Sequence, residues 1–426
     1  MALGGGTFTN QNKVLPGAYI NFVSTAVASA AVGDRGVVAL GLDMSWGDTF
    51  YELTAGDFQK QSQKLLGYSY SDDACLTLRD VFKNATKVYL YRLNSDSLKA
   101  SNAFSNAKFG GVRGNDLSIS IVQNIDDTTT FEVSTLLDNE TVDTQTVKQA
   151  SELVANDYVT FKADATLTAT AKTPLTGGTD TVSKTTSHQA MLDKLESYPD
   201  INAIGYLGTD ATVKGLYTAW AKRLRDEVGI KLQAVVENYP SADSEAVVSV
   251  KNTGAVAWAL GVIGGTAINE SASNKKYDGE TTIEADYTQS ELEQAITKGE
   301  WVLHRVGSDI RVLSDINTLT TTTADKGDVF KSNQTIRVCD QIATDIASLF
   351  ATKYLGAIPN DASGRTSLWA DIVKHHQTLR NMRAIDDFSD EDITVAQGDT
   401  KTSVAVTDAI TIINSMEKLY MTVVVS

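Results

Sequence analysis

The last eleven residues of the chain, 416–426, have the alternating pattern of a β-strand. Successive side chains of a strand point to opposite faces, so apolar residues at every second position give one face to bury. The residues that would share that face are Leu419, Met421, Val423 and Val425. A strand at the end of a chain needs a sheet to join, and that sheet lies either in the same subunit or in a neighbouring one.

A second strand-like segment lies near the other end, at residues 16–22 (PGAYINF), where Tyr19, Ile20 and Phe22 are the expected contacts. We expect residues 1–32 to form an N-terminal arm, because a GGG start and a polar stretch precede this segment. If both arms pair with sheets of neighbouring copies, each subunit donates and accepts strands, and the product is a polymer. Pairing of either arm within its own subunit is the alternative.

The composition limits the partners that such a chain can have. The formal net charge is −16, so general binding to nucleic acid or to anionic membranes is not expected, because both would repel the chain. Cys75 and Cys339 are the only cysteines, which excludes a disulfide framework and favours a reducing compartment. The longest strongly apolar stretch, 255–268, is shorter than the roughly 20 residues that a transmembrane helix needs. We expect neither direct nucleic-acid binding nor membrane insertion.

Composition and periodicity predict a multidomain protein of α/β and α+β parts. Residues 33–99 alternate buried-strand and amphipathic-helix patterns, and 181–318 continue this alternation, which is typical of a largely parallel sheet covered by helices. Residues 100–180 are instead rich in Thr, Asp and Val with short alternating runs, which predicts an inserted β-sandwich domain. Residues 319–415 predict a C-terminal α+β domain, followed by the C-terminal strand arm at 416–426.

The expected elements follow from these periods. Strands are expected at 37–42, 87–93, 117–122, 130–136, 158–161, 201–207, 230–236, 246–250 and 403–411, and a hairpin from 301–304 and 310–313. Helices are expected at 72–84, 188–197, 213–228, 254–262, 288–298, 336–354 and 367–382. Thr288 precedes Glu291 by three residues, which is the spacing of a capping box at the start of a helix.

The residue types that carry chemistry do not form a recognisable constellation. Of the four histidines only His375 and His376 are neighbours, and adjacent helical positions point about 100° apart, which indicates a structural or surface role rather than a metal site. The glycine-rich run 261–266 lacks the spacing of a phosphate or dinucleotide loop, so close packing or a helix end is favoured. The acidic run 386–392 lacks the glycine and terminal glutamate of a calcium loop and predicts a solvated turn. We expect no catalytic residue, no cofactor and no metal.

Several segments, taken in order along the chain, together resemble one family. They are PGAYINF, the inserted β domain, TQSELEQAITKGEWVL at 288–303, SDIRVLSDINTL at 308–319, the long helix opening with Arg337, and the terminal strand. In this order the chain resembles the tail sheath proteins of contractile phages, including those of phage-like R-type bacteriocins. The resemblance implies a subtilisin-like fold for the middle domain without its catalytic triad, because His188 and His304 have no matching serine motif.

The resemblance also implies a mechanism and a set of partners. Sheath subunits stack as rings around an inner tube and add arm strands to their neighbours, so this chain would form a helical homo-oligomer. Contraction to a second packing would drive the tube through the target cell envelope. The implied partners are the inner tail tube protein, the baseplate and the terminator or collar proteins, and assembly would take place in the bacterial host cytoplasm. The tube-facing candidates are Lys374, Arg380 and Arg383, for which a plain solvated face is the alternative.

Two other functions stay open at the level of sequence. An α/β hydrolase or other small-molecule enzyme would need a convergent polar triad or a metal cluster. A surface-layer or adhesin-type structural protein would suit the Thr-rich β domain and would carry a cleaved signal peptide, for which the small residues at 26–33 are the candidate site.

Overall fold

The computed structural model describes residues 33–425. The predicted N-terminal arm, with Tyr19, Ile20 and Phe22, lies outside the described residues. The chain divides into two compact units: the main unit, residues 34–343 with the segment from 412 onward, and the small unit, residues 344–411 with Gly33. The boundary falls inside helix α7 (Asn333–Leu349).

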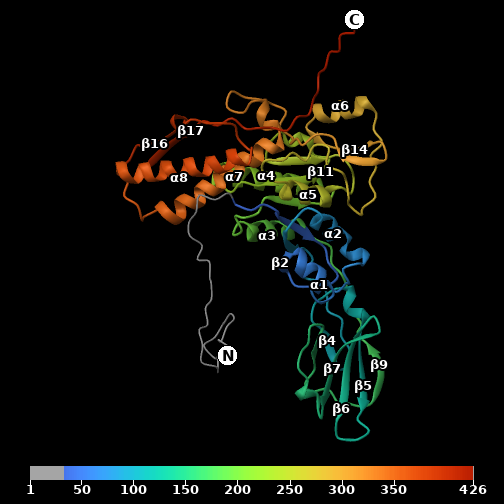
Figure 1. The fold of residues 1–426 in the computed structure, drawn as a ribbon. Helices are drawn as coiled ribbons and strands as arrows, with labels where there is room; N and C mark the ends of the chain where they lie inside the picture. The colour runs from blue at the N-terminus through green and yellow to red at the C-terminus, as the bar shows by residue number, and fades with distance from the viewer. Residues whose placement is uncertain (1–32, 426) are drawn as a thin grey trace, which may run out of the picture. The chain divides into compact units, whose positions relative to one another are not determined.

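A seven-stranded sheet forms the centre of the main unit (Figure 1). All neighbouring strands in it are parallel except β2 and β3, which are antiparallel. The largely parallel sheet predicted from the alternating helix and strand patterns is therefore confirmed. In spatial order the strands are β13 (Glu300–Trp301), β12 (Val247–Val250), β11 (Gln233–Glu237), β10 (Ala203–Tyr206), β1 (Val37–Leu42), β3 (Lys87–Arg92) and β2 (Phe50–Thr54).

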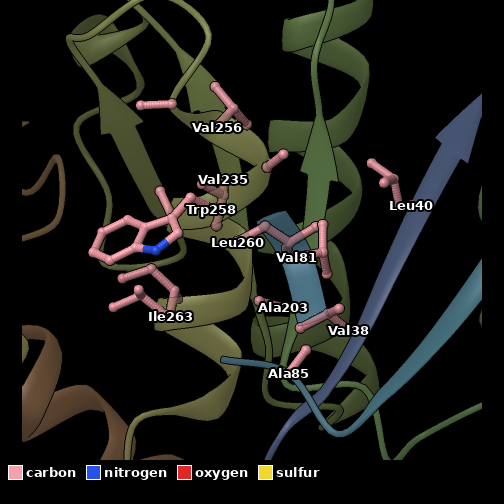
Figure 2. Close-up of a cluster of buried hydrophobic side chains, with 14 of the residues drawn as sticks. Val38, Leu40, Val81, Ala85, Ala203, Val235, Val256, Trp258, Leu260 and Ile263 are labelled. Carbon is pink, nitrogen blue, oxygen red and sulfur yellow. The ribbon is translucent and has the colours of Figure 1, made fainter. Parts of the chain in front are cut away.

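Helices cover both faces of this sheet. In β1, Val38 and Leu40 join the core on one face, which Figure 2 shows, and Ala39 joins the core on the other. Burial on both faces explains why the central strands are almost entirely apolar. Helices α2 and α5 contribute to the first core, and α3 and α4 to the second. The helices are α1 (Ala55–Leu66), α2 (Leu76–Phe82), α3 (Thr185–Leu195), α4 (Ala211–Arg223), α5 (Val256–Gly265) and α6 (Gln289–Thr297).

Helix α5 packs closely against its neighbours because glycines lie on its contact face. A Cβ atom placed on Gly261 would lie 2.3 Å from the carbonyl oxygen of Val81, and one placed on Gly265 would lie 1.9 Å from that of Asn84. Both separations are well below van der Waals contact, so only glycine fits at these positions. The helix also ends at Gly265. Close packing and a helix end, the two interpretations favoured for run 261–266, are both confirmed.

The inserted domain consists of two antiparallel sheets around a shared core, which confirms the predicted β-sandwich. One sheet has the order β7-β6-β5-β9, and the other pairs β4 with β8. The two connections to the rest of the main unit pair with each other, since the Leu98 N–H donates to Thr179 O at 3.1 Å and the Ser101 N–H donates to Thr176 O at 2.8 Å. The strands are β4 (Ser105–Ala107), β5 (Leu117–Gln123), β6 (Phe131–Leu137), β7 (Glu140–Val147), β8 (Val159–Phe161) and β9 (Thr170–Pro174).

Two local predictions for the main unit, a capping box and a hairpin, are confirmed, but one residue expected in the hairpin belongs to another strand. The Glu291 N–H donates to Thr288 Oγ1 at 3.3 Å and the Thr288 N–H donates to Glu291 Oε2 at 2.8 Å, so the capping box is confirmed. Strands β14 (Leu303–Val306) and β15 (Asp309–Val312) form the predicted hairpin. Trp301, however, belongs to β13 of the central sheet, because its strand pairs with β12.

In the small unit, helices pack against a two-stranded sheet. The second part of α7 continues into a π-helical turn, Phe350–Tyr354, and α8 (Ala362–Asn381) follows. Strand β16 (Ile393–Gln397) pairs antiparallel with β17 (Val404–Asp408). All of these elements except β17 contribute fully buried side chains to one core: Leu349, Tyr354, Leu368, Ile372, Val373 and Ile393.

One predicted helix of the small unit has a different start, and one strand of this unit was not predicted. Helix α8 begins at Ala362 and not at 367, because Asp361 accepts a hydrogen bond from the Gly364 N–H at 2.7 Å and caps the helix there. The acidic run 386–392 forms the predicted turn, including a short 3₁₀ segment at Asp390–Asp392. The turn leads directly into β16, which is absent from the predicted elements.

Candidate assembly interface

The C-terminal arm is extended and exposed (Figure 1). Residues 416–425 belong to no helix or strand, and within the described residues no strand pairs with them. The exposed fraction is 86% for Leu419, 74% for Met421, 69% for Val423 and 89% for Val425. Among the described residues the segment is therefore not a core strand, because a strand forms only where a second strand satisfies its backbone groups. Its apolar face and its peptide groups are available to a partner.

Within residues 33–425, no third strand pairs with either edge of the β16–β17 hairpin of the small unit. Strand β16 packs against the small-unit core through Ile393 and Val395, whereas β17 is mostly exposed and Val406 is 43% exposed. A two-stranded sheet is only marginally stable by itself and gains from a third strand. By contrast, the edge strand β13 of the central sheet has only two residues. The hairpin is therefore a suitable acceptor for an added strand.

An apolar hollow lies beside the first residue of β17. It has a volume of about 100 Å³, and Val404 forms part of its wall. Phe350, Leu355 and Ile358 also line it and are exposed apolar side chains. Clustered exposed apolar side chains are typical of interaction surfaces, so the hollow extends the candidate interface beyond the open strand edge.

The three predicted tube-facing residues lie on the surface of the small unit. Lys374 and Arg380 are exposed on α8, and Arg383 follows the helix with a left-handed backbone (φ 61°). At about 100° per residue, Lys374 and Arg380 point about 120° apart around the helix axis, so the three do not form a single stripe. Arg380 Nε lies 3.9 Å from Asp387 Oδ1. Contact with a tube stays a prediction.

The two adjacent histidines of α8 are buried in the small unit. His375 Nε2 lies 2.9 Å from Asp345 Oδ2, and His376 Nδ1 lies 3.1 Å from the carbonyl oxygen of Ile372. His376 Nε2 is 2.9 Å from Asp408 Oδ2, but the two groups are not aligned for a hydrogen bond. Because the pair connects α8 with α7 and β17, the predicted structural role is confirmed.

The remaining histidines, His188 and His304, lie in the main unit. His188 Nδ1 lies 3.0 Å from the hydroxyl of the buried Tyr217. Burial lowers the pKa of His188 and raises that of Tyr217, so both rings are held neutral. Burial also lowers the pKa of His304. In residues 33–425, no group of three or more His, Cys, Asp or Glu side chains is placed to hold a metal ion.

Two buried ion pairs anchor the first part of α7 in the main unit. Arg337 pairs with Asp315, each with a side chain 1% exposed, and Arg225 Nη2 lies 2.6 Å from Asp340 Oδ1. Burial by itself would raise the pKa of Asp315, but the charge and hydrogen bond of Arg337 lower that pKa below its usual range. Arg337 stands out in the sequence only as part of the opening of the long helix, and its partner is not predictable there, because no sequence period connects it with Asp315.

The described part of the chain contains no helix that is both long and apolar enough to span a bilayer.

Four family models match consecutive parts of the chain. They are the tail sheath protein Gp18 domain III N-terminal region at residues 35–93, the phage tail sheath protein beta-sandwich domain at 95–180, the phage tail sheath protein central domain at 181–318 and the phage tail sheath C-terminal domain at 325–426. Together these models define the class of the protein as a structural component of phage-type tails.

Similar proteins extend over almost the whole chain. The sheath tail protein of Desulfitobacterium hafniense is 36% identical, with a TM-score of 0.84 over 95% of this chain and 99% of that chain. The phage-like element PBSX protein XkdK of Bacillus subtilis (strain 168) is 32% identical over 100% of both chains. The anti-feeding prophage helical sheath in its contracted state shares the fold at 13% identity, with a TM-score of 0.57 over 97% of this chain and 99% of that chain. The chain belongs to the phage tail sheath protein family.

Proposed function

We propose that this chain is the subunit of a contractile tail sheath, which polymerises helically around an inner tube and contracts to drive that tube through a target cell envelope. The observation that carries the proposal is the exposed apolar arm at residues 419–425, which pairs with no strand among the described residues of its own chain. An extended segment of this kind can add as a strand to an exposed sheet edge of a second subunit.

The arm of one subunit would add a strand to the β16–β17 hairpin of another. The free edges of the hairpin and the hollow beside Val404, which an apolar arm side chain would fill, support this choice of acceptor. Seven residues in a strand span about 23 Å at about 3.3 Å per residue. Ladder hydrogen bonds of roughly 0.5–1.5 kcal/mol each, together with the buried apolar face, would contribute several kcal/mol per arm.

The contacts in such a sheath are heterologous, since a donor surface meets a different acceptor surface, and they build an open helix. Contraction requires two packings of the same subunits, with the contracted packing lower in free energy and a barrier between them. The energy is stored at assembly. The arms would keep neighbouring subunits connected while the packing changes.

The remaining partners are proposed on the family relationship. The inner tail tube protein would contact Lys374, Arg380 and Arg383 through exposed charge pairs worth about 0–1 kcal/mol each, which is weak enough for release. Baseplate and terminator or collar proteins would bind the ends of the sheath, and assembly would occur in the bacterial host cytoplasm. The middle domain would be a subtilisin-like scaffold without catalysis, because His188 is bonded to Tyr217 and not placed between a serine and a carboxylate.

Negative-stain electron microscopy of the purified chain at high concentration tests this function. The full chain is expected to form hollow tubes, and a variant lacking residues 419–426 is expected to remain monodisperse. A matched pair of point variants distinguishes the effect of lost strand pairing from the effect of a shorter chain. Val423→Pro removes a backbone donor and should abolish tubes, whereas Val423→Thr keeps a residue that favours strands and should preserve them.

Tubes that persist in both the truncated chain and Val423→Pro would contradict assembly through the arm. Monodisperse particles of the full chain at every concentration tested would contradict spontaneous strand exchange.

A further inference from the structure

Residues 413–417 lead into the C-terminal arm and include its first two residues, and we call them the arm base. They make hydrogen bonds with side chains of the main unit. Gln334 Nε2 donates to the carbonyl oxygen of Ile413 at 3.2 Å, and the Ser415 N–H donates to Gln334 Oε1 at 3.0 Å. One residue of a parallel strand makes the same two bonds to the peptide groups that flank the residue opposite. The buried Gln334 side chain therefore replaces a strand partner for the arm base.

The last residue of the base, Glu417, is held by two hydroxyl groups. Ser273 Oγ donates to Glu417 Oε1 at 2.5 Å, and Ser314 Oγ lies 3.4 Å from Glu417 Oε2. Ser273 Oγ also accepts from the Asp315 N–H at 2.9 Å, so its single proton is directed to Glu417. Asp315 in turn pairs with the buried Arg337. A continuous series of polar contacts thus links the arm base to a buried ion pair at the start of α7.

These contacts, and not tight packing, hold the arm base. A pocket of about 690 Å³ adjoins it, with Gln334, Asn414, Ser415, Glu417 and Lys418 among the lining residues. Beside an open pocket few dispersion contacts are made, so each polar contact contributes a larger share of the local order.

We propose that Gln334, Ser273 and Glu417 form a clamp that fixes the direction in which the arm leaves its subunit. The inference rests on the proposed function of the arm. A strand whose start is fixed loses less orientational freedom when it pairs with a neighbour, so the clamp strengthens strand addition. When a neighbouring subunit pulls on the arm, the clamp transmits the force to Asp315 and helix α7. The arm base therefore stays bound to the main unit.

The test is amide hydrogen exchange of the purified subunit, read at the Ser415 N–H. Glu417→Ala is expected to speed this exchange by about five- to tenfold, because it removes a charge-assisted hydrogen bond from the base. Ser273→Ala removes the same bond, together with the bond from the Asp315 N–H, and should speed the exchange at least as much. Glu417→Gln retains an acceptor oxygen for Ser273 and should stay closer to the unmodified chain. The matched control is Lys418→Ala, which lies beyond the clamp and should change the exchange by less than about twofold.

Exchange at Ser415 that is unchanged in Glu417→Ala and Ser273→Ala would overturn the clamp, as would equal acceleration in Lys418→Ala. Because the measurement needs no assembly, it is independent of the proposed function. If the chain lacking residues 419–426 still forms tubes, the function of the arm fails and the clamp stands. If that truncation removes the tubes and the exchange pattern is absent, only the clamp fails.

Discussion

Strand β1 and the C-terminal arm have similarly apolar sequences in opposite surroundings. In β1, Val38, Ala39 and Leu40 are fully buried and their strand pairs on both sides, with β3 and with β10. In the arm, residues 419–425 are exposed and unpaired within the described chain. An apolar pattern thus determines that a segment can form a strand, whereas the position of the partner strand depends on the rest of the chain or on another subunit.

Because β1 is buried and the arm is exposed, substitutions in the core of the main unit should destabilise the subunit far more than substitutions in the arm. Arg337→Met should lower the free energy of unfolding by about 3–5 kcal/mol, because Asp315 would be left as an uncompensated buried charge. Urea unfolding followed by circular dichroism measures the change. The matched control, Lys331→Met, breaks the exposed pair with Asp328 and should cost no more than about 1 kcal/mol.

The Arg337 effect should also depend on pH. In the folded chain the pKa of Asp315 is held below its usual range, so this group contributes stability above its unfolded pKa of about 3.9 and loses it as the pH falls through the folded pKa. The difference in stability between the unmodified chain and Arg337→Met should therefore shrink as the pH is lowered from 7 towards 3. A difference that stays constant over this range would show that the carboxylate charge is not the cause.

A substitution at a closely packed glycine of α5 should change the stability of the subunit by an intermediate amount. Gly265→Ala should destabilise the subunit by about 1–3 kcal/mol, because its Cβ would collide with the carbonyl oxygen of Asn84. Gly215→Ala in α4 is the matched control, since the nearest atom to its Cβ would be Tyr239 Oη at 3.7 Å. This change should stabilise the subunit by about 0.5–1 kcal/mol. Thermal unfolding of the two variants should move the melting temperature in opposite directions, and a parallel loss would contradict the packing argument.

The smallest effect is expected in the arm. Replacing Leu419, Met421 and Val423 together with serine should change the free energy of unfolding of the isolated subunit by less than about 0.5 kcal/mol, because these side chains are exposed. Urea unfolding at low protein concentration, where subunits do not assemble, measures this. A loss of several kcal/mol would mean that the arm packs on its own subunit in solution, and the contrast with β1 would disappear.

The elements that could be predicted from the sequence are mainly those whose apolar pattern follows from burial of their side chains. Strand 37–42 was expected with the bounds that β1 has, because a short, continuously apolar run is typical of a strand that is buried on both faces. The glycine-rich run in α5 was interpreted correctly because the usual motifs for phosphate binding could be checked and were absent. The inserted β-sandwich was visible as a change in composition.

Some strands at the edges of sheets were missed, β2 and β7 among them. Strand β2 has one buried residue, Leu53, and β7 has one, Val147, so neither shows a clear apolar period. Local sequence signals beside both strands could have located them. Thr54 caps α1 by accepting from the Asp57 N–H at 3.2 Å, and the left-handed pair Asp138 and Asn139 forms the two-residue turn before β7.

The candidate interface was predictable only in part. The alternation of the arm is a local pattern, so its capacity to form a strand could be read from the sequence. The clamp could not, because Gln334, Ser273 and Glu417 are far apart in the chain and meet only after the main unit has folded. Arg337 and Asp315 illustrate the same point, since neither residue type nor spacing identifies a buried pair.

The paired connections of the β-sandwich domain have a consequence for design. Leu98 and Ser101 bond to Thr179 and Thr176, so the chain enters and leaves the β-sandwich domain through two adjacent segments. Because the two ends of the domain lie side by side, its length can vary without changing the strand order of the central sheet. A foreign domain with adjacent ends could be grafted in its place, provided that it also covers Trp46, which now lies in the core of the β-sandwich.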